Sequence, residues 1–254
     1  MERYHFVSDN CLILSEGVEA LDLEFMEGFD DPSHLQKIQK LVIPSTLTQI
    51  DCSVWDKFTG LQEISVCLQN AHFISVAGVL YTKDQKALVK YPAGKQDAYF
   101  EIPPKVATIC RNAFLHATYL NTVKVGCGVS TIEEMAFFNA LGLRHIYISN
   151  HVTNIRGPYI FGVCDEQQIF LCEWCLVVGG ETGSEIEKWC AQYGVNFYPM
   201  NEKEIGDFLA LPLPDLHPYN GENDSYLSAS RKTAREKSIE PDPEAERLFG
   251  NLPF

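Results

Sequence analysis

A 23-residue internal repeat constrains the fold of this chain more than any other feature. Ile109, Ile132 and Ile155 are separated by 23 residues each, and four further columns of large residues keep the same step. These columns are Val106–Val129–Val152, Ile102–Val125–Ile148–Leu171, Val123–Ile146–Ile169 and Phe114–Phe137–Ile160. Five columns with one period predict a solenoid, because a unit this short cannot bury its apolar face alone and must stack on its neighbours.

Each repeat unit begins with a segment of the form apolar-x-x-apolar-x-apolar. The last two apolar positions are two residues apart, which places their side chains on one face of a β-strand. Seven segments predict parallel strands in this way: residues 18–23, 38–43, 61–66, 97–102, 120–125, 143–148 and 166–171. A Val-x-x-Ile step and a compact pair such as Ala113-Phe114 or Val54-Trp55 follow the strand. We interpret the pair as a turn of α- or 3₁₀-helix on the outer side, and the class as a β-rich (α+β) repeat solenoid.

The full repeat pattern is L-x-x-I-x-I-P-x-x-V-x-x-I-x-x-x-A-F, seen best from Phe100 to Phe114. It resembles the BspA-like, or treponemal-type, leucine-rich-repeat family. The resemblance covers residues 18–198 and departs from the pattern where Tyr159-Ile160 replaces Ala-Phe. It implies a right-handed solenoid of the leucine-rich-repeat type, with a parallel β-sheet on its concave side.

A second family feature is a β-hairpin insert between two repeats. Its two halves stand here as FISVAGVLY at Phe73–Tyr81 and LVKYPAGK at Leu88–Lys95. The resemblance therefore implies a hairpin insert at about residues 70–96. This insert accounts for the one interruption of the period, between Val66 and Ile102.

The two ends of the solenoid need covers, because a terminal repeat exposes an apolar end. Ser184 and Glu187 form an S-x-x-E capping box, which marks the start of a helix. Apolar residues recur after it at helical spacing, at Ile186, Trp189, Cys190 and Tyr193. We expect a capping helix at about residues 184–193, and an N-terminal cap formed by residues 1–17.

The composition changes at Pro199. Residues 199–254 are rich in proline and acidic residues, and the 23-residue step does not continue. Such a composition predicts a mostly disordered tail. Its apolar clusters, Phe208–Leu213 and Leu248–Phe254, are either partner motifs or segments that fold back on the solenoid.

Composition excludes several functions. The formal net charge of −14 disfavours binding to nucleic acid and to anionic membrane surfaces. No apolar run approaches the roughly 20 residues that a membrane span needs, and the N-terminus does not read as a signal peptide. The odd number of cysteines, nine, favours a reducing compartment. The expected location is cytoplasmic, or the cell surface if an export segment precedes this sequence.

The pair Cys172 and Cys175 is the sharpest chemical motif. A C-x-x-C spacing suits a redox pair or half of a zinc site, with Cys164 and His151 as further zinc ligands. The pair follows a predicted strand rather than opening a helix. Cys172 also shares a repeat position with Cys67, just after the strand. Buried structural cysteine is therefore the favoured interpretation, with no metal and no cofactor. The histidines, serines and glycines match no catalytic or phosphate-binding motif.

The remaining candidate is the surface of the predicted sheet. In each strand, the residues that alternate with the buried ones must point outward. Among them we expect a binding site at Tyr99, Glu101, Lys124, His145, Tyr147 and Phe170. Exposed aromatic side chains suit recognition, because they provide a large contact area at a low entropy cost.

The sequence therefore predicts a non-enzymatic scaffold that binds a protein or a glycan through its concave sheet. One alternative is a thiol- or metal-dependent protein that uses Cys172 and Cys175. A second alternative is an adhesion protein at the cell surface. The sequence names no partner and no oligomeric state.

Overall fold

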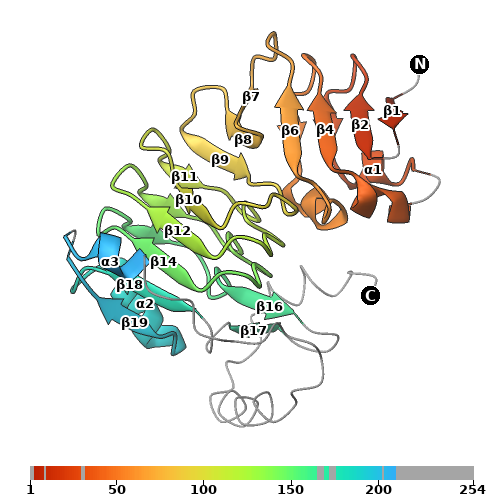
Figure 1. The fold of residues 1–254 in the computed structure, drawn as a ribbon. Coiled ribbons are helices and arrows are strands. Elements are labelled where there is room, and N and C mark those ends of the chain that lie inside the picture. Colours follow the sequence, from red (N-terminus) through yellow and green to blue (C-terminus); the bar gives the residue numbers. More distant parts are fainter. Residues whose placement is uncertain are drawn as a thin grey trace. The chain divides into compact units, whose positions relative to one another are not determined.

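The structure is a computed structural model that describes residues 3–8, 10–29, 32–164, 169–171, 176–201 and 203–209. The chain divides into two compact units. The first comprises Met1–Val163 and Leu171–Pro212, and the second comprises Cys164–Phe170 and Leu213–Phe254. The first unit contains the repeats, and its fold is described below (Figure 1).

Five parallel strands form what we call the main sheet. In spatial order they are β10 (Tyr99–Glu101), β12 (Thr122–Val125), β14 (His145–Ile148), β18 (Val177–Gly180) and β19 (Phe197–Pro199). The register pairs Phe100 with Val123 and Val123 with Ile146, so each step between the first three strands is one repeat. The predicted parallel sheet is confirmed.

A second sheet runs through the same repeats. Its strands, in spatial order, are β15 (Asn154–Ile155), β13 (Thr131–Ile132), β11 (Thr108–Ile109), β9 (Ala87–Lys90), β8 (Val79–Thr82) and β7 (Phe73–Val76). The first four pair in parallel, whereas β7, β8 and β9 pair antiparallel. The predicted hairpin insert is confirmed, and its third strand, β9, is the start of the parallel part of this sheet.

The N-terminal repeats form their own sheet, with the order β1 (Tyr4–Ser8), β2 (Cys11–Leu14), β4 (Lys40–Ile43) and β6 (Glu63–Val66). The prediction of a strand of this sheet at residues 18–23 is wrong. The first repeat strand is β2, which pairs Leu12 with Leu41. Within 18–23, Ala20–Leu21 (β3) instead pairs with β5 (Gln49–Ile50). The chain then enters α1 (Leu23–Met26), whose first turn is capped by Asp22.

The prediction of a further main-sheet strand at residues 166–171 is also wrong. Beside β14 lies β18, which pairs Ile146 with Val178. The strands β16 (Gly162–Cys164) and β17 (Ile169–Leu171) are not part of the main sheet. The apolar run at Ile169–Leu171 fits a strand, but a period in the sequence does not determine which neighbour that strand pairs with.

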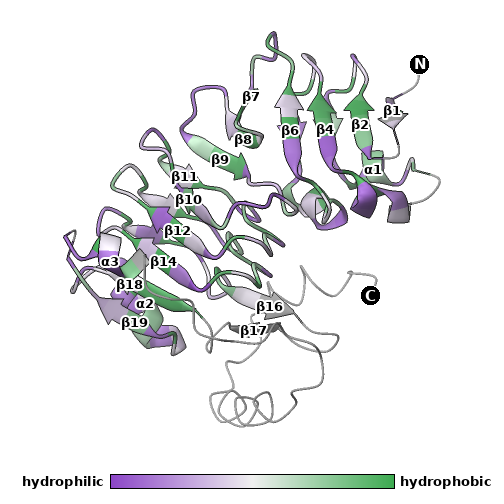
Figure 2. Ribbon diagram, viewed as in Figure 1, coloured by the Kyte–Doolittle hydropathy of each residue, from purple (hydrophilic) through white to green (hydrophobic). Residues whose placement is uncertain are grey.

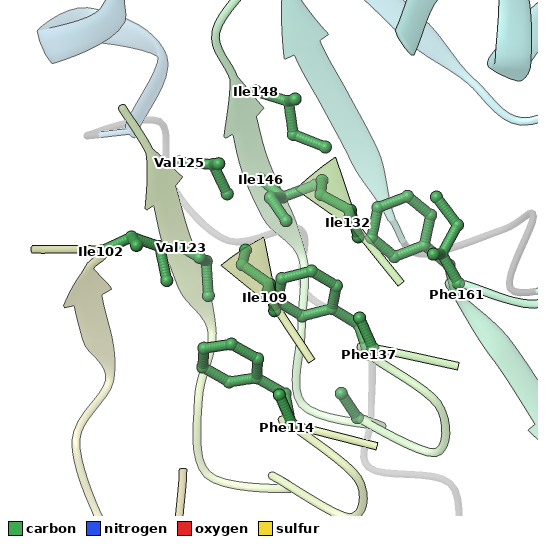
Figure 3. Packing of buried hydrophobic residues seen from close by; sticks show 14 of the residues in the cluster. Ile102, Ile109, Phe114, Val123, Val125, Ile132, Phe137, Ile146, Ile148 and Phe161 are labelled. Carbon is green, nitrogen blue, oxygen red and sulfur yellow. The ribbon is translucent and has the colours of Figure 1, made fainter. Parts of the chain in front are cut away.

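The core is built from columns of identical repeat positions (Figure 3). Between the sheets lies a ladder of rings, in which Tyr91, Phe114, Phe137 and Phe161 stack with centroids 5.2, 4.6 and 5.6 Å apart. All four side chains are buried. The sequence predicted Ile160 as the last member of this column, but the structure places Phe161 there. The Phe114 amide donates to the carbonyl of Ala136, the residue before Phe137. The Phe137 amide donates to the carbonyl of Ile160, the residue before Phe161. The turn before Phe161 therefore holds one extra residue.

The turns on the outer side differ between early and late repeats. The early ones are the 3₁₀-helices η1 (Pro32–Lys37) and η2 (Cys52–Lys57), so the expected helical turn at Val54-Trp55 is confirmed. The Ala113-Phe114 and Ala136-Phe137 pairs lie in non-helical turns, so the helical turn expected at these pairs is wrong. Residues with positive φ break these turns, at Asn112, His116, Met135 and Asn139.

The predicted capping helix is α2 (Glu185–Tyr193). The Ser184 side chain accepts a hydrogen bond from the Glu187 amide, and Gly194 ends the helix with a φ of 73°. These are the capping box and the left-handed C-terminal residue that favour a helix of this length. On its buried face, Trp189 packs edge-on against Phe161 and its indole N–H donates to the Gly157 carbonyl at 3.0 Å. The helix thus covers the end of the aromatic ladder.

Candidate functional site

The main sheet has a face that points away from the aromatic ladder, which we call the outward face. Val123, Ile146 and Val178 point into the core, so their strand neighbours on either side point to the outward face. In the main sheet of Figure 2, green hydrophobic and purple hydrophilic residues both occur along the strands. The register places two rows on this face: Tyr99–Thr122–His145–Val177, and Glu101–Lys124–Tyr147–Gly179–Tyr198.

On β10 and β12, Tyr99, Glu101 and Lys124 reach solvent, whereas Thr122 is buried. Tyr99 is 47% exposed, and its hydroxyl donates to Glu101 at 3.3 Å. Lys124 forms an ion pair with Glu101 at 2.9 Å. Partial burial, followed by the charge of Glu101, raises the pKa of Tyr99, so the phenol stays protonated. The structure brings these three predicted residues together as one aromatic and charged surface, the Tyr99 patch.

The part of the outward face on β14 is covered, and the prediction that Tyr147 and His145 are exposed is wrong. Tyr147 is 2% exposed and His145 is 3% exposed. Tyr147 packs with Met200, Ile205 and Phe208, the last two from α3 (Ile205–Leu209), which lies beside β14 (Figure 1). Phe208 also meets the His145 ring edge-on, with centroids 5.4 Å apart. Met200, Ile205 and Phe208 therefore fold back onto the sheet, so the predicted disordered tail does not begin at Pro199; residues 210–254 lie outside the described residues.

Gly179 provides the space for this cover. A Cβ at this position would meet the end of the Met200 side chain and would lie 3.0 Å from the Phe208 ring. A side chain there would therefore displace the ring or the strand. The glycine stands in the Tyr147 row, where the neighbouring repeats carry large residues. The sheet is thus hollowed where the C-terminal segment packs.

Phe170 does not join the predicted site. It lies on β17, which is not part of the main sheet. The row continues instead to Gly179 and then to Tyr198, which is 55% exposed and stacks on Phe208 with centroids 6.0 Å apart. Sequence reasoning missed Tyr198 because β19 follows the helix and does not keep the 23-residue step.

The N-terminal sheet repeats the charge pattern of the Tyr99 patch. Lys40 on β4 and Glu63 on β6 form an ion pair at 2.8 Å. The hydrogen bond from Lys40 holds the pKa of Glu63 below its usual value, and a second hydrogen bond from Ser65 acts in the same direction. In both sheets, a lysine and a glutamate on adjacent strands neutralise each other across one repeat.

Cys110 and Cys190 are thiols whose pKa is raised. Burial raises the pKa of Cys110 and of Cys190 to about 12, so both stay protonated at neutral pH. Cys67 is half-buried and donates to the Gln69 side chain. Cys172 and Cys175 lie outside the described residues. Among the residues that are described, no three His, Cys, Asp or Glu side chains gather in a way that could hold a metal ion.

Lys90, the last residue of β9, has a strongly lowered pKa. It is fully buried, and this desolvation lowers its pKa to about 7, although the charge of Asp56 acts in the opposite direction. The ammonium group donates to the carbonyls of Leu115 at 2.8 Å and Asn112 at 3.3 Å. Its contacts are therefore those of a structural group, which satisfies the carbonyls of a non-helical outer turn.

Within the described ranges, no helix is both long and apolar enough to cross a bilayer.

Comparison with known proteins agrees with the repeat pattern. Residues 95–173 match, in six copies, the family model described as BspA type leucine rich repeat region. No curated protein sequence matches the chain significantly.

Three solved bacterial structures are similar. A leucine rich cell surface protein from Faecalibacterium prausnitzii A2-165 is 20% identical over 80% of this chain and 63% of its own, with a TM-score of 0.53. A leucine-rich repeat protein from Eubacterium ventriosum ATCC 27560 is 27% identical over 57% of this chain and 37% of its own, with a TM-score of 0.49. The pneumococcal vaccine antigen PcpA is 14% identical over 65% of this chain and 56% of its own, with a TM-score of 0.38. This chain thus spans less than two thirds of each, and the first likeness shows a shared fold.

Proposed function

We propose that this chain, whose residues 95–173 form a BspA-type leucine-rich-repeat region, is a non-enzymatic scaffold that binds a protein partner. The binding surface is the outward face, and its recognition site is the Tyr99 patch on β10 and β12. Repeat scaffolds bind along such sheets because stacked units present a continuous, rigid surface. The family and its fold support recognition as the general role.

The observation that carries this proposal is the exposed tyrosine beside an ion pair of one acidic and one basic side chain. Tyr99 offers an aromatic surface that the hydrogen bond to Glu101 already orients, so little side-chain entropy is lost on binding. Glu101 and Lys124 offer one charge of each sign at fixed positions. Such charges select a partner by complementarity more than they add affinity.

The test uses affinity capture from the source cells with the full chain. The double variant Tyr99→Ala/Lys124→Glu changes the patch, and Tyr119→Ala is the control, because Tyr119 is 53% exposed but belongs to neither row. We expect proteins enriched by the wild type and by the control to be lost with the double variant, while circular dichroism shows an unchanged fold. Equal capture by all three chains would refute the proposal. Capture that disappears after glycosidase treatment of the lysate would assign the face to a glycan instead.

A further inference from the structure

We propose that the outward face over β14 and β18 is a docking site for a short apolar peptide segment of a partner, and that residues 200–209 occupy it as a built-in ligand. We call this site the cradle and residues 200–209 the plug. The inference rests on the proposed function in one respect, namely that the outward face is the face that binds partners.

The cradle is an apolar site separate from the repeat core. Its floor consists of Tyr147 and Val177, which form a cluster with plug residues rather than with the aromatic ladder. His145 forms one side and meets Phe208 edge-on. Gly179 leaves the space into which Met200 and Phe208 fit. The cradle is therefore shaped for anchors that come from outside the repeats.

The plug has its own local structure. The Glu204 carboxylate accepts from the Asn201 amide at 2.9 Å, and the Asn201 side chain accepts from the Lys203 amide at 3.0 Å. These two bonds close the turn that precedes α3, and the Phe208 amide donates to the Glu204 carbonyl within the same segment. The described backbone bonds from 201 to 208 are thus internal. The Met200 amide donates to the Gly180 carbonyl of β18 at 2.8 Å, so the plug joins the sheet at its first residue, and Ile205 and Phe208 contact the cradle through their side chains.

The plug defines the chemistry that the cradle accepts. Ile205 and Phe208 are three residues apart on α3 and lie on its buried side, whereas Gly206 and Asp207 are exposed. With Met200 they provide two aliphatic anchors and one aromatic anchor. A partner peptide that fits the cradle is accordingly a short amphipathic helix with the same three anchors, the helix-in-groove mode of recognition.

When the plug covers the cradle, one polar atom of His145 is buried without a hydrogen bond to any described residue. Its ring is 3% exposed, yet Nδ1 has no hydrogen-bond partner among the described residues. Burial, and then the charge of Arg144, lowers the pKa of His145, so the ring is neutral at pH 7 and suits an apolar ligand. A buried polar atom without a partner disfavours the covered state, because opening would return it to water. This is expected of a contact that opens, and a partner with a donor facing His145 would bind more tightly than the plug.

The test is binding of a labelled synthetic peptide, with the sequence of residues 199–210, to the full chain. In the wild type the plug competes intramolecularly at a high effective concentration, so binding in trans is weak. In the variant Ile205→Ala/Phe208→Ala the plug loses its anchors. We expect fluorescence anisotropy to show at least tenfold tighter peptide binding by this variant than by the wild type. The matched control is Asp207→Asn, on the exposed side of α3, which should behave like the wild type.

Two further variants make the result specific. A peptide that carries Phe208→Ala should not bind, and Gly179→Val added to the plug variant should abolish binding, because the new side chain fills the cradle. A folded plug variant that does not bind the peptide would overturn the proposal. So would a dimeric wild type in which residues 200–209 are exchanged between two copies, as shown by light scattering and mixed-isotope cross-linking.

Hydrogen exchange on the wild type avoids dependence on any variant. The amide of Phe208, which is bonded within the plug, should exchange at least tenfold faster than the amides of β12, because the plug opens without global unfolding. Equal protection would mean that the plug is a fixed part of the fold. The two proposals fail separately. If partner capture depends on Tyr99 and Lys124 but the peptide does not bind, only the cradle proposal is refuted. If the peptide binds but capture does not depend on Tyr99 and Lys124, only the proposal for the Tyr99 patch is refuted.

Discussion

The strands β12 and β14 are adjacent copies of one repeat, yet their outward faces differ. Lys124 and Tyr147 occupy the same row and are paired in register, but Lys124 is partly exposed in an ion pair while Tyr147 lies beneath Met200, Ile205 and Phe208. The inward faces of the two strands are equivalent, since Val123 and Ile146 are both fully buried. Repetition therefore determines which way a side chain points, whereas segments outside the repeats determine whether it meets solvent.

The largest loss of stability is expected from a substitution in the core that both strands share. Phe137 lies between Phe114 and Phe161 in the aromatic ladder, so Phe137→Ala should lower the free energy of unfolding by about 3–5 kcal/mol. Urea denaturation followed by circular dichroism measures this change. Tyr119→Ala, at an exposed position, should change the free energy by no more than about 0.5 kcal/mol. Similar values for the two variants would contradict the ladder as the centre of the core.

A smaller loss of stability is expected from a substitution in the plug, which covers β14. Phe208 is buried against His145 and Tyr198, but the plug can separate from the sheet while the repeats stay folded. Phe208→Ala should therefore lower the free energy of unfolding by less than Phe137→Ala does, by about 1–2 kcal/mol. Hydrogen exchange should show the loss of protection within residues 201–208. A loss that spreads evenly over β10 and β12 would contradict a local cover.

Lys90, on strand β9 of the insert, should make the free energy of unfolding depend on pH. Its pKa is about 7 in the folded chain and near its ordinary value of 10.5 after unfolding. Above pH 7 the unfolded chain thus binds more protons than the folded one, so this group makes stability rise with pH, by at most about 1.4 kcal/mol per unit. Urea denaturation of wild type and Lys90→Met from pH 7 to 8.5 measures the difference, since the variant should lose this rise. Parallel curves would show that Lys90 is charged in the folded chain.

The smallest effect on stability is expected at the Tyr99 patch. The ion pair of Lys124 with Glu101 is largely solvent-exposed, and such pairs contribute about 0–1 kcal/mol. Glu101→Gln should therefore leave the free energy of unfolding nearly unchanged while it weakens partner capture. A loss above about 2 kcal/mol would mean that the patch is structural rather than a binding surface.

The period in the sequence predicted the parts of the fold that the repeats control. The strands β10, β12 and β14, the hairpin insert and the helix α2 all follow from local patterns that agree with the tertiary structure. The errors fall where the period stops. The strand at 166–171 fitted the period, but one extra residue before Phe161 and the intervening β16 and β17 moved the next main-sheet strand to β18.

The candidate site was predictable only in part, for the same reason. Tyr99, Glu101 and Lys124 point to the outward face as the alternation of the strands predicts, and all three reach solvent. The burial of His145 and Tyr147 depends on a contact between β14 and α3 that no repeat encodes. Two features indicate it: Gly179 in a row of large side chains, and Phe208, the first residue of the apolar cluster Phe208–Leu213, for which folding back on the solenoid was one of two interpretations. Both are meaningful only once the pairing of β14 with β18 is known.

Hydroxyl-radical footprinting of the two tyrosines tests the contrast between open and covered strands most directly. In the wild type, Tyr99 should be oxidised rapidly and Tyr147 slowly, because their exposures are 47% and 2%. In Ile205→Ala/Phe208→Ala, the oxidation of Tyr147 should accelerate towards that of Tyr99, while Tyr99 itself is unchanged. Equal oxidation of both tyrosines in the wild type would contradict the covered face. An unchanged, slow Tyr147 in the variant would show that something other than the plug covers it.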